Sequence, residues 1–251
     1  MAVWLLTSIS AQGQQSSRVL IAAASDLKYA LDSIISVFKN VNREARVDVT
    51  FGSSGKLYEQ ISNGAPFDLF FSADIDYPSK LKKKGFIVAQ IQTYGIGRIV
   101  LWSKKIDLTS PDLNVLLKKS IVKVAIANPA HAPYGRRAEE ALKKSGIYEQ
   151  IKDKLVYGEN ISQTAQFVTT GAADVGIVAL SLALSPTMKN MKGFYYVIPD
   201  SLHSPLTQAF VMLKHAQKNS VALRFKDFML AKDAREILSY FGFGKINSIK
   251  K

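Results

Sequence analysis

The sequence contains no cysteine among its 251 residues, so disulfide frameworks, thiolate metal sites and cysteine nucleophiles are excluded. Acidic residues are also few, with 20 Asp and Glu against 33 Lys and Arg, which leaves a net charge of +13 at pH 7. Beyond the N-terminus, no apolar run reaches the roughly 18 residues that a membrane-spanning helix needs. The chain is 47% hydrophobic and 21% charged, a composition that builds a globular core, and its length predicts about two domains.

Residues 1–17 carry no charge, and their apolar run at 3–6 precedes a polar stretch at 12–17. This pattern is typical of the end of a signal peptide, with cleavage expected near the small residues at 11–13. We therefore expect an exported protein.

Short apolar runs alternate with helical patterns along the rest of the chain. From Leu27 to Phe38, apolar residues recur at the spacing of one helix face. Gly146 and Gly171 stand where helix C-caps belong. We expect strands at 19–24, 46–51, 68–72, 122–127, 154–157, 175–178 and 209–213, apolar runs at 99–102 and 194–198, and helices near 27–38, 56–62, 76–84, 134–144, 162–169 and within 220–241. Repeated strand and helix units favour an α/β fold with parallel strands.

Four expected strand-to-helix junctions carry residues that suit a helix N-terminus. These junctions lie at 25–26, 52–55, 128–135 and 158–163. Ser25, Ser54 and Asn160 are N-cap types. Pro133 suits a first turn, and Asn160 with Gln163 approximates a capping box. In an open α/β sheet such turns lie at the carboxyl ends of the strands, so two facing edges would direct several helix N-termini at one point, which makes an anion site.

Uncharged donors of this kind suit a tetrahedral oxyanion, because its oxygens accept hydrogen bonds from several directions at once. About six charge-assisted hydrogen bonds of ~1.5–3 kcal/mol each suffice for micromolar binding after the costs of desolvation and lobe closure. With few acceptors near the ligand, a protonated oxyanion would leave its O–H unpaired. A fully deprotonated dianion is therefore preferred.

At these junctions the sequence resembles the periplasmic molybdate-binding proteins, the substrate-binding components of molybdate ABC transporters. The matching segments are AAASDL at 22–27, FGSSG at 51–55, GAPFDLFFSAD at 64–74, NP at 128–129 with APYG at 132–135, and DVGIVA at 174–179. Their order and spacing carry the resemblance, which runs from about residue 19 to 243. It implies the two-lobed α/β fold of type II periplasmic binding proteins, with the ligand in the interlobe cleft.

The same resemblance divides the chain and assigns the site. Lobe 1 would comprise residues 18–94 plus 206–251, and lobe 2 residues 95–205, with crossover segments at both ends of lobe 2. The oxyanion would be bound by the hydroxyl and main-chain N–H of Ser25 and Ser54 in lobe 1. Lobe 2 would add the main-chain N–H groups of Tyr134 and Ile161, and no residue would ligate the metal directly.

The sequence departs from the family pattern at two positions. Ala179 stands where many relatives have a tyrosine whose hydroxyl is a donor, and Tyr134 stands where some have a small residue. The Tyr134 phenol is a candidate to replace the missing donor. Asp26 would repel a dianion, so we expect its carboxylate to point away from the ligand and cap its own helix.

The sequence contains neither of two catalytic motifs that residues 52–57 partly match. The stretch at 52–57 is not a phosphate-binding P-loop, because Thr50 and Leu57 stand where Gly and Ser or Thr are required. It is not a hydrolase nucleophile elbow either, because Lys56 replaces a required Gly. We expect no enzyme activity.

Neither a metal site nor nucleic-acid binding is expected. The histidines, His131, His203 and His215, are not paired at i+3 or i+4, which argues against zinc. The lysine clusters fall mainly at expected helix ends, and no basic tract is interleaved with aromatics, which favours a solvated surface.

Together these features predict a periplasmic monomer, without a cofactor, that closes two lobes around molybdate, and also tungstate, and delivers it to an inner-membrane ABC permease. Sulfate or another small oxyanion is the alternative within this fold. An alternative of another class is a basic surface-binding protein for anionic polymers, with the cleft incidental.

Overall fold

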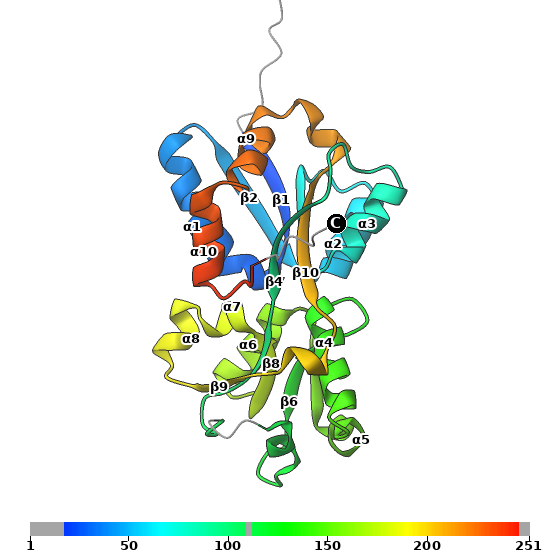
Figure 1. The fold of residues 1–251 in the computed structure, drawn as a ribbon, viewed down its shortest axis with the longest axis vertical. Helices are drawn as coiled ribbons and strands as arrows, with labels where there is room; N and C mark the ends of the chain where they lie inside the picture. The colour runs from blue at the N-terminus through cyan, green and yellow to red at the C-terminus, as the bar shows by residue number, and fades with distance from the viewer. Residues whose placement is uncertain (1–17, 109–111, 246–251) are drawn as a thin grey trace, which may run out of the picture.

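The computed structural model describes residues 18–108 and 112–245, so the predicted signal peptide at 1–17 lies outside the described residues. Figure 1 shows two lobes, one above the other, each built on its own five-stranded sheet with helices packed around it. This confirms the expected two-lobed α/β architecture. Lobe 1 here denotes the part built on the first sheet, and lobe 2 the part built on the second.

The first sheet, in the upper lobe of Figure 1, has the strand order β2-β1-β3-β10-β4. β1, β2 and β3 are parallel, whereas β10 pairs antiparallel with β3 and β4. The strands are β1 (Arg18–Ala24), β2 (Arg46–Gly52), β3 (Leu69–Ser72), β4 (Gln92–Gly97) and β10 (Leu206–Met212). A late segment of the chain therefore returns to the middle of the first sheet.

The second sheet has the order β7-β6-β8-β5-β9. β6 is parallel to β7 and β8, whereas β5 pairs antiparallel with β8 and β9. The strands are β5 (Ile99–Ser103), β6 (Val124–Ala127), β7 (Leu155–Gly158), β8 (Val175–Ala179) and β9 (Phe194–Val197). All five come from one continuous part of the chain.

The helices follow the strands in both lobes. Lobe 1 contains η1 (Ser25–Leu27), α1 (Lys28–Val41), α2 (Ser54–Ser62), α3 (Asp76–Lys83), η5 (Lys214–Lys218), α9 (Ser220–Phe228) and α10 (Lys232–Tyr240). Lobe 2 contains η2 (Leu113–Leu117), α4 (Pro133–Lys144), α5 (Tyr148–Ile151), η3 (Lys152–Lys154), α6 (Ile161–Thr170), α7 (Leu180–Ala183), α8 (Pro186–Asn190) and η4 (Asp200–Leu202). Within residues 18–108 and 112–245, no helix is long and apolar enough to cross a membrane.

Helix α1 buries the apolar face that its sequence pattern predicts. The apolar positions predicted for one face are buried, and Phe38 meets Phe225 of α9 edge-on with ring centroids 5.0 Å apart. Gly171 ends α6 in the left-handed conformation, with φ of 84°, as its C-cap position predicts. The amphipathic spacing thus fixes which face of α1 covers the first sheet.

The structure differs from the sequence prediction mainly between the lobes. Residues 92–97 form β4, a strand that the sequence pattern did not predict. β4 belongs to the first sheet, which therefore extends three residues beyond the expected boundary at residue 94. A Cβ at Gly97 would lie 2.5 Å from the Tyr134 hydroxyl and 2.5 Å from Gln208 Nε2. Glycine therefore permits a close approach here, which is a recognised use of glycine inside a strand.

Candidate functional site

A small cavity lies where helix N-termini from both lobes converge. Its volume is about 10 Å³, which is the room that about one buried water needs. The size class that matches is a small ion, not a sugar, peptide or nucleotide. The lining residues are Ala24, Ser25, Asp26, Gly52, Ser53, Ser54, Ala73, Ala132, Pro133, Tyr134 and Ile161.

The four predicted site residues all line this cavity. Ser25 is the first residue of η1, Ser54 the first of α2, Tyr134 the second of α4 and Ile161 the first of α6. The first N–H groups of a helix have no partner within it and carry its positive partial charge, so each of these positions offers a main-chain donor. All four residues are buried. The cavity therefore brings together donors from two lobes.

The two serines occupy different positions from those predicted. The N-cap of α2 is Ser53 rather than Ser54, and Ala24 rather than Ser25 precedes η1. Ser25 and Ser54 are each the first residue of their helix, and both line the cavity.

The Ser54 hydroxyl is oriented toward donation. Its Oγ accepts a hydrogen bond from the Ala73 N–H at 2.9 Å, so its own proton remains available to another acceptor. The Ser25 hydroxyl instead bridges the lobes, because it donates to Asn160 Oδ1 at 3.1 Å and accepts from the Ser162 N–H at 3.3 Å. In this closed arrangement Ser25 contributes its main-chain N–H more directly than its side chain.

Asn160 holds the N-terminus of α6 in place. Its Oδ1 accepts from the N–H groups of Ser162 and Gln163 at 3.0 and 3.1 Å, which confirms the predicted cap. The Gln163 side chain returns one residue earlier than in a capping box, since its Oε1 accepts from the Glu159 N–H.

Among the described residues that line the cavity, only Asp26 has an ionisable carboxyl side chain. Its Oδ2 accepts from the Tyr134 hydroxyl at 2.9 Å and from Gln208 Nε2 at 2.8 Å. Burial raises the pKa of the Asp26 carboxyl to about 6, although these two hydrogen bonds and the nearby N–H groups of Asp26 and Leu27 lower it.

This cluster corrects the two expectations about polar side chains at the site. The Tyr134 phenol donates to Asp26, so it does not replace the donor missing at Ala179. Asp26 was expected to point away from the ligand and cap its own helix; its carboxylate lines the cavity and accepts from α4 and β10, and it is also influenced by the N–H groups of Asp26 and Leu27 at its own helix start. Burial and the adjacent Asp26 charge raise the pKa of Tyr134 well above its usual value, which keeps the phenol a donor.

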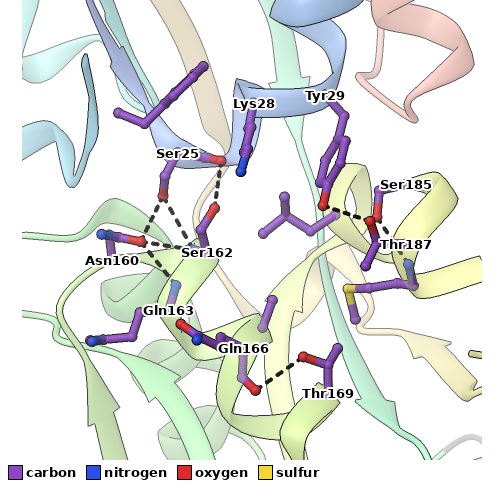
Figure 2. A pocket seen from close by; sticks show the side chains of 14 residues that line it. Ser25, Lys28, Tyr29, Asn160, Ser162, Gln163, Gln166, Thr169, Ser185 and Thr187 are labelled. Atoms are coloured by element: carbon purple, nitrogen blue, oxygen red, sulfur yellow. Dashed lines mark hydrogen bonds between the residues drawn. The ribbon is translucent and has the colours of Figure 1, made fainter. Parts of the chain in front are cut away.

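A larger hollow of about 600 Å³ adjoins the cavity at Ser25. Figure 2 shows its side chains, with Ser25 bonded to Asn160 and to Ser162, and Tyr29 reaching Thr187 in the opposite lobe. Ten of its fourteen lining residues have polar side chains, and one of these, Lys28, is a cation. The hollow is a polar vestibule between the lobes that leads to the cavity wall.

A second set of contacts joins the lobes at the other side of α4. Arg136 is hydrogen-bonded and ion-paired to Asp74, and it donates to the Tyr77 hydroxyl at 3.1 Å. Next to it, the Gly55 N–H donates to the His131 carbonyl oxygen at 2.9 Å. The lobes are therefore held together by a charged contact outside the cavity as well as by contacts around it.

Sequence reasoning missed Arg136 and Gln208 and considered His131 only as a possible zinc ligand. Arg136 sits in an ordinary amphipathic helix and gave no signal. Gln208 is fully buried in β10, and a lone amide in an apolar strand is a signal that could have been used. His131 faces Ser53 Oγ at 3.1 Å and Glu159 Oε2 at 3.5 Å, an interlobe position rather than a plain surface one. Across residues 18–108 and 112–245, no three His, Cys, Asp or Glu side chains gather as metal ligands.

Comparisons with known proteins agree with this geometry. The chain matches the family described as bacterial extracellular solute-binding protein over residues 19–244. It is 36% identical to the molybdate-binding protein ModA of Azotobacter vinelandii, over 97% of this chain and 96% of that protein. It is 38% identical to the ModA of Rhodobacter capsulatus, over 78% and 77%.

A solved structure shows the same arrangement of the chain. The periplasmic molybdate-binding protein of Azotobacter vinelandii superposes with a TM-score of 0.86 at 30% identity, over 91% of this chain and all of that one. The protein therefore belongs to the bacterial extracellular solute-binding proteins, and within them to the group that contains the molybdate-binding proteins.

Proposed function

We propose that this protein is an exported, non-enzymatic binding protein that captures molybdate, and also tungstate, between its lobes and delivers it to an inner-membrane ABC permease. The observation that carries the proposal is the convergence of four helix N-termini, two from each lobe, on one small cavity. Such N-termini bind anions through N–H groups and the helix dipole. The relatives named above supply the identity of the anion.

The assigned donors are the main-chain N–H groups of Ser25, Ser54, Tyr134 and Ile161, together with the Ser54 hydroxyl. The cavity lining contains no Lys, Arg or His among the described residues. Selection then rests on geometry and on the number of N–H and O–H donors, rather than on net positive charge. An oxyanion that needs few acceptors from the protein fits this set best.

Lobe closure creates a surface that the permease can recognise. Donors from both lobes reach one anion only when the lobes are together, so binding favours the closed state by its differential free energy. The permease can therefore recognise a closed, loaded protein by its surface. We propose that the protein acts as a monomer in this exchange.

Calorimetry with molybdate, tungstate, sulfate and phosphate on the mature chain tests the proposal. We expect one-to-one binding of molybdate and tungstate and no detectable binding of sulfate or phosphate. Sulfate binding of comparable strength would favour the other small oxyanion. A steep, salt-dependent association with DNA or heparin, without oxyanion binding, would favour the anionic-polymer alternative.

A further inference from the structure

The Asp26 carboxyl is placed against the anion cavity and is almost completely enclosed. The residue is 1% exposed and lines the cavity. Its two oxygens differ: Oδ2 accepts two hydrogen bonds, whereas Oδ1 is buried with no hydrogen-bond partner among the described residues. A buried polar atom without a partner is costly, so Oδ1 calls for an explanation.

The hydrogen-bond directions around Oδ2 are fixed by a chain of neighbours. The Tyr94 hydroxyl donates to Gln208 Oε1 at 2.6 Å, which leaves Gln208 Nε2 as the donor toward Asp26. Gln208 Nε2 also donates to the Tyr134 oxygen at 2.9 Å, so the Tyr134 proton is directed at Oδ2. Oδ2 is therefore saturated with donors, and any proton on this carboxyl belongs on Oδ1.

Among the described residues, no Lys, Arg or His is hydrogen-bonded or ion-paired to the Asp26 carboxyl. Tyr134 of α4 and Tyr94 of β4 are the titratable neighbours, and Gln208 of β10 is neutral. Ser181 of α7 donates its hydroxyl to the Asp26 carbonyl oxygen at 2.8 Å. Burial is the main cause that raises the pKa of Asp26. The causes that lower it are the hydrogen bonds of Gln208 and Tyr134 and the main-chain N–H groups of Asp26 and Leu27, and no cation is among them. An ionised Asp26 beside a bound dianion would place three negative charges in one desolvated volume.

We infer that Asp26 binds the oxyanion in its protonated form, with the Oδ1 hydroxyl donating a hydrogen bond to the anion. The inference rests on the proposed function. One proton is taken up when a dianion binds to the ionised protein: the carboxylate gains an O–H bond at Oδ1, and the proton comes from the solvent. Asp26 thereby becomes a specificity-determining donor, and the affinity depends on pH.

The protonated carboxyl both binds the anion and discriminates between anions. Protonation gives Asp26 Oδ1 the hydrogen bond that it lacks and adds a donor to the cavity. A neutral Asp26 that already donates its proton has no free lone pair well placed for an anion's own O–H. Hydrogen phosphate would therefore compete poorly with molybdate.

The test is calorimetry of molybdate binding to the full chain across a pH range in which molybdate stays fully deprotonated. At about pH 6 the wild type should bind, which checks the proposed function. Above that, its Kd should rise about tenfold per pH unit. Repeating the titration in buffers of different ionisation enthalpy should show close to one proton taken up per anion at about pH 8.

Two variants sharpen the result. Asp26→Asn replaces the Oδ1 hydroxyl by an N–H donor and keeps an oxygen for Tyr134 and Gln208, so its Kd should be independent of pH and about a hundredfold lower than that of the wild type near pH 8. Asp68→Asn is the control: Asp68 is also a buried lobe 1 carboxylate whose Oδ1 has no hydrogen bond within the described chain, although His215 Nε2 lies 3.5 Å from it, and Asp68 lies outside the cavity. It should keep the wild-type pH dependence.

Three results would overturn the inference while leaving molybdate binding intact. They are a wild-type Kd that does not change with pH and shows no proton uptake, an Asp26→Asn variant with the wild-type slope, and hydrogen phosphate binding that the Asn variant loses. The last would mean that Asp26 accepts a proton from the anion. If the wild type binds no oxyanion at any pH, the proposed function fails and the inference falls with it.

Discussion

Replacing Arg136 with Met should weaken molybdate binding about tenfold, although Arg136 lies outside the cavity. Its guanidinium crosses from α4 to lobe 1, where it bonds to Asp74 and Tyr77 and lies 5.4 Å from the centre of the Tyr77 ring. These contacts require the two lobes to be together. Losing them shifts the protein toward an open state in which the anion meets donors from only one lobe.

The magnitude follows from how exposed the pair is. A hydrogen bond to a charged group contributes ~1.5–3 kcal/mol when water is excluded. The Asp74 side chain is 4% exposed, but that of Arg136 is 31% exposed, so solvent screening places the contribution at the lower end. About 1.5 kcal/mol corresponds to roughly a tenfold change in Kd, which appears in full when the ligand-free protein is mostly open.

Calorimetry on Arg136→Met measures the affinity, and small-angle scattering of the ligand-free protein reports how open it is. The matched control is Arg137→Met on the same helix, because Arg137 pairs with Glu140 inside lobe 2. The control should bind like the wild type. Equal Kd values for the two variants would refute the idea that the Arg136 contact contributes to closure.

Further changes around the cleft have equally definite outcomes. Gly55→Ala should abolish tight binding, because its Cβ would lie 2.6 Å from the His131 carbonyl oxygen across the cleft. The Cβ would also lie 2.7 Å from the Tyr77 hydroxyl within lobe 1, but that atom is the end of a side chain that can shift, so the free energy of unfolding should fall less than the binding free energy. Calorimetry and urea denaturation measure the two effects, and unimpaired binding would contradict the prediction. Ser54→Ala should weaken molybdate binding by ~1–3 kcal/mol, since it removes one buried donor; a titration like that of the wild type would show that the site is misassigned. Asp26→Asn should abolish the fall in the free energy of unfolding that the wild type shows as pH rises. The folded protein holds the Asp26 proton up to about pH 6, whereas the ordinary pKa is 3.8, so stability falls as pH rises through this interval, by about 3 kcal/mol in total. Urea denaturation at several pH values should show this fall in the wild type and not in the variant, and an equal fall in both would exclude Asp26 as its source.

The location of the site followed from local rules that act over a few residues. The helix starts at Pro133 and Asn160 are encoded by their own side chains, and strand polarity places such starts at one edge of a sheet. The meeting of two sheet edges came from the family resemblance, since no local pattern specifies how two lobes face each other.

The side-chain cluster at Asp26 could not be predicted in the same way. Asp26, Tyr134 and Gln208 are brought together by contacts across 108 and 182 residues of sequence. Each residue taken alone has an ordinary local explanation: Asp26 is an acidic residue at a helix start, Tyr134 an aromatic residue in a helix, and Gln208 an amide in a strand. Which partner each one meets depends on the closed packing of the lobes, and that is why the Tyr134 phenol was assigned to the wrong acceptor.

The position of β10 between β3 and β4 in the first sheet has a consequence for the order in which the chain acquires structure. Until Leu206–Met212 is available, β4 has no neighbour and β3 has an open edge, so lobe 1 stays incomplete until the last part of the chain is made. The strands of the second sheet, by contrast, are contiguous from Ile99 to Val197 and can pair earlier. Lobe 1, whose first strand leaves the ribosome first, is therefore the last to mature, and a truncation before residue 206 should leave only lobe 2 able to fold.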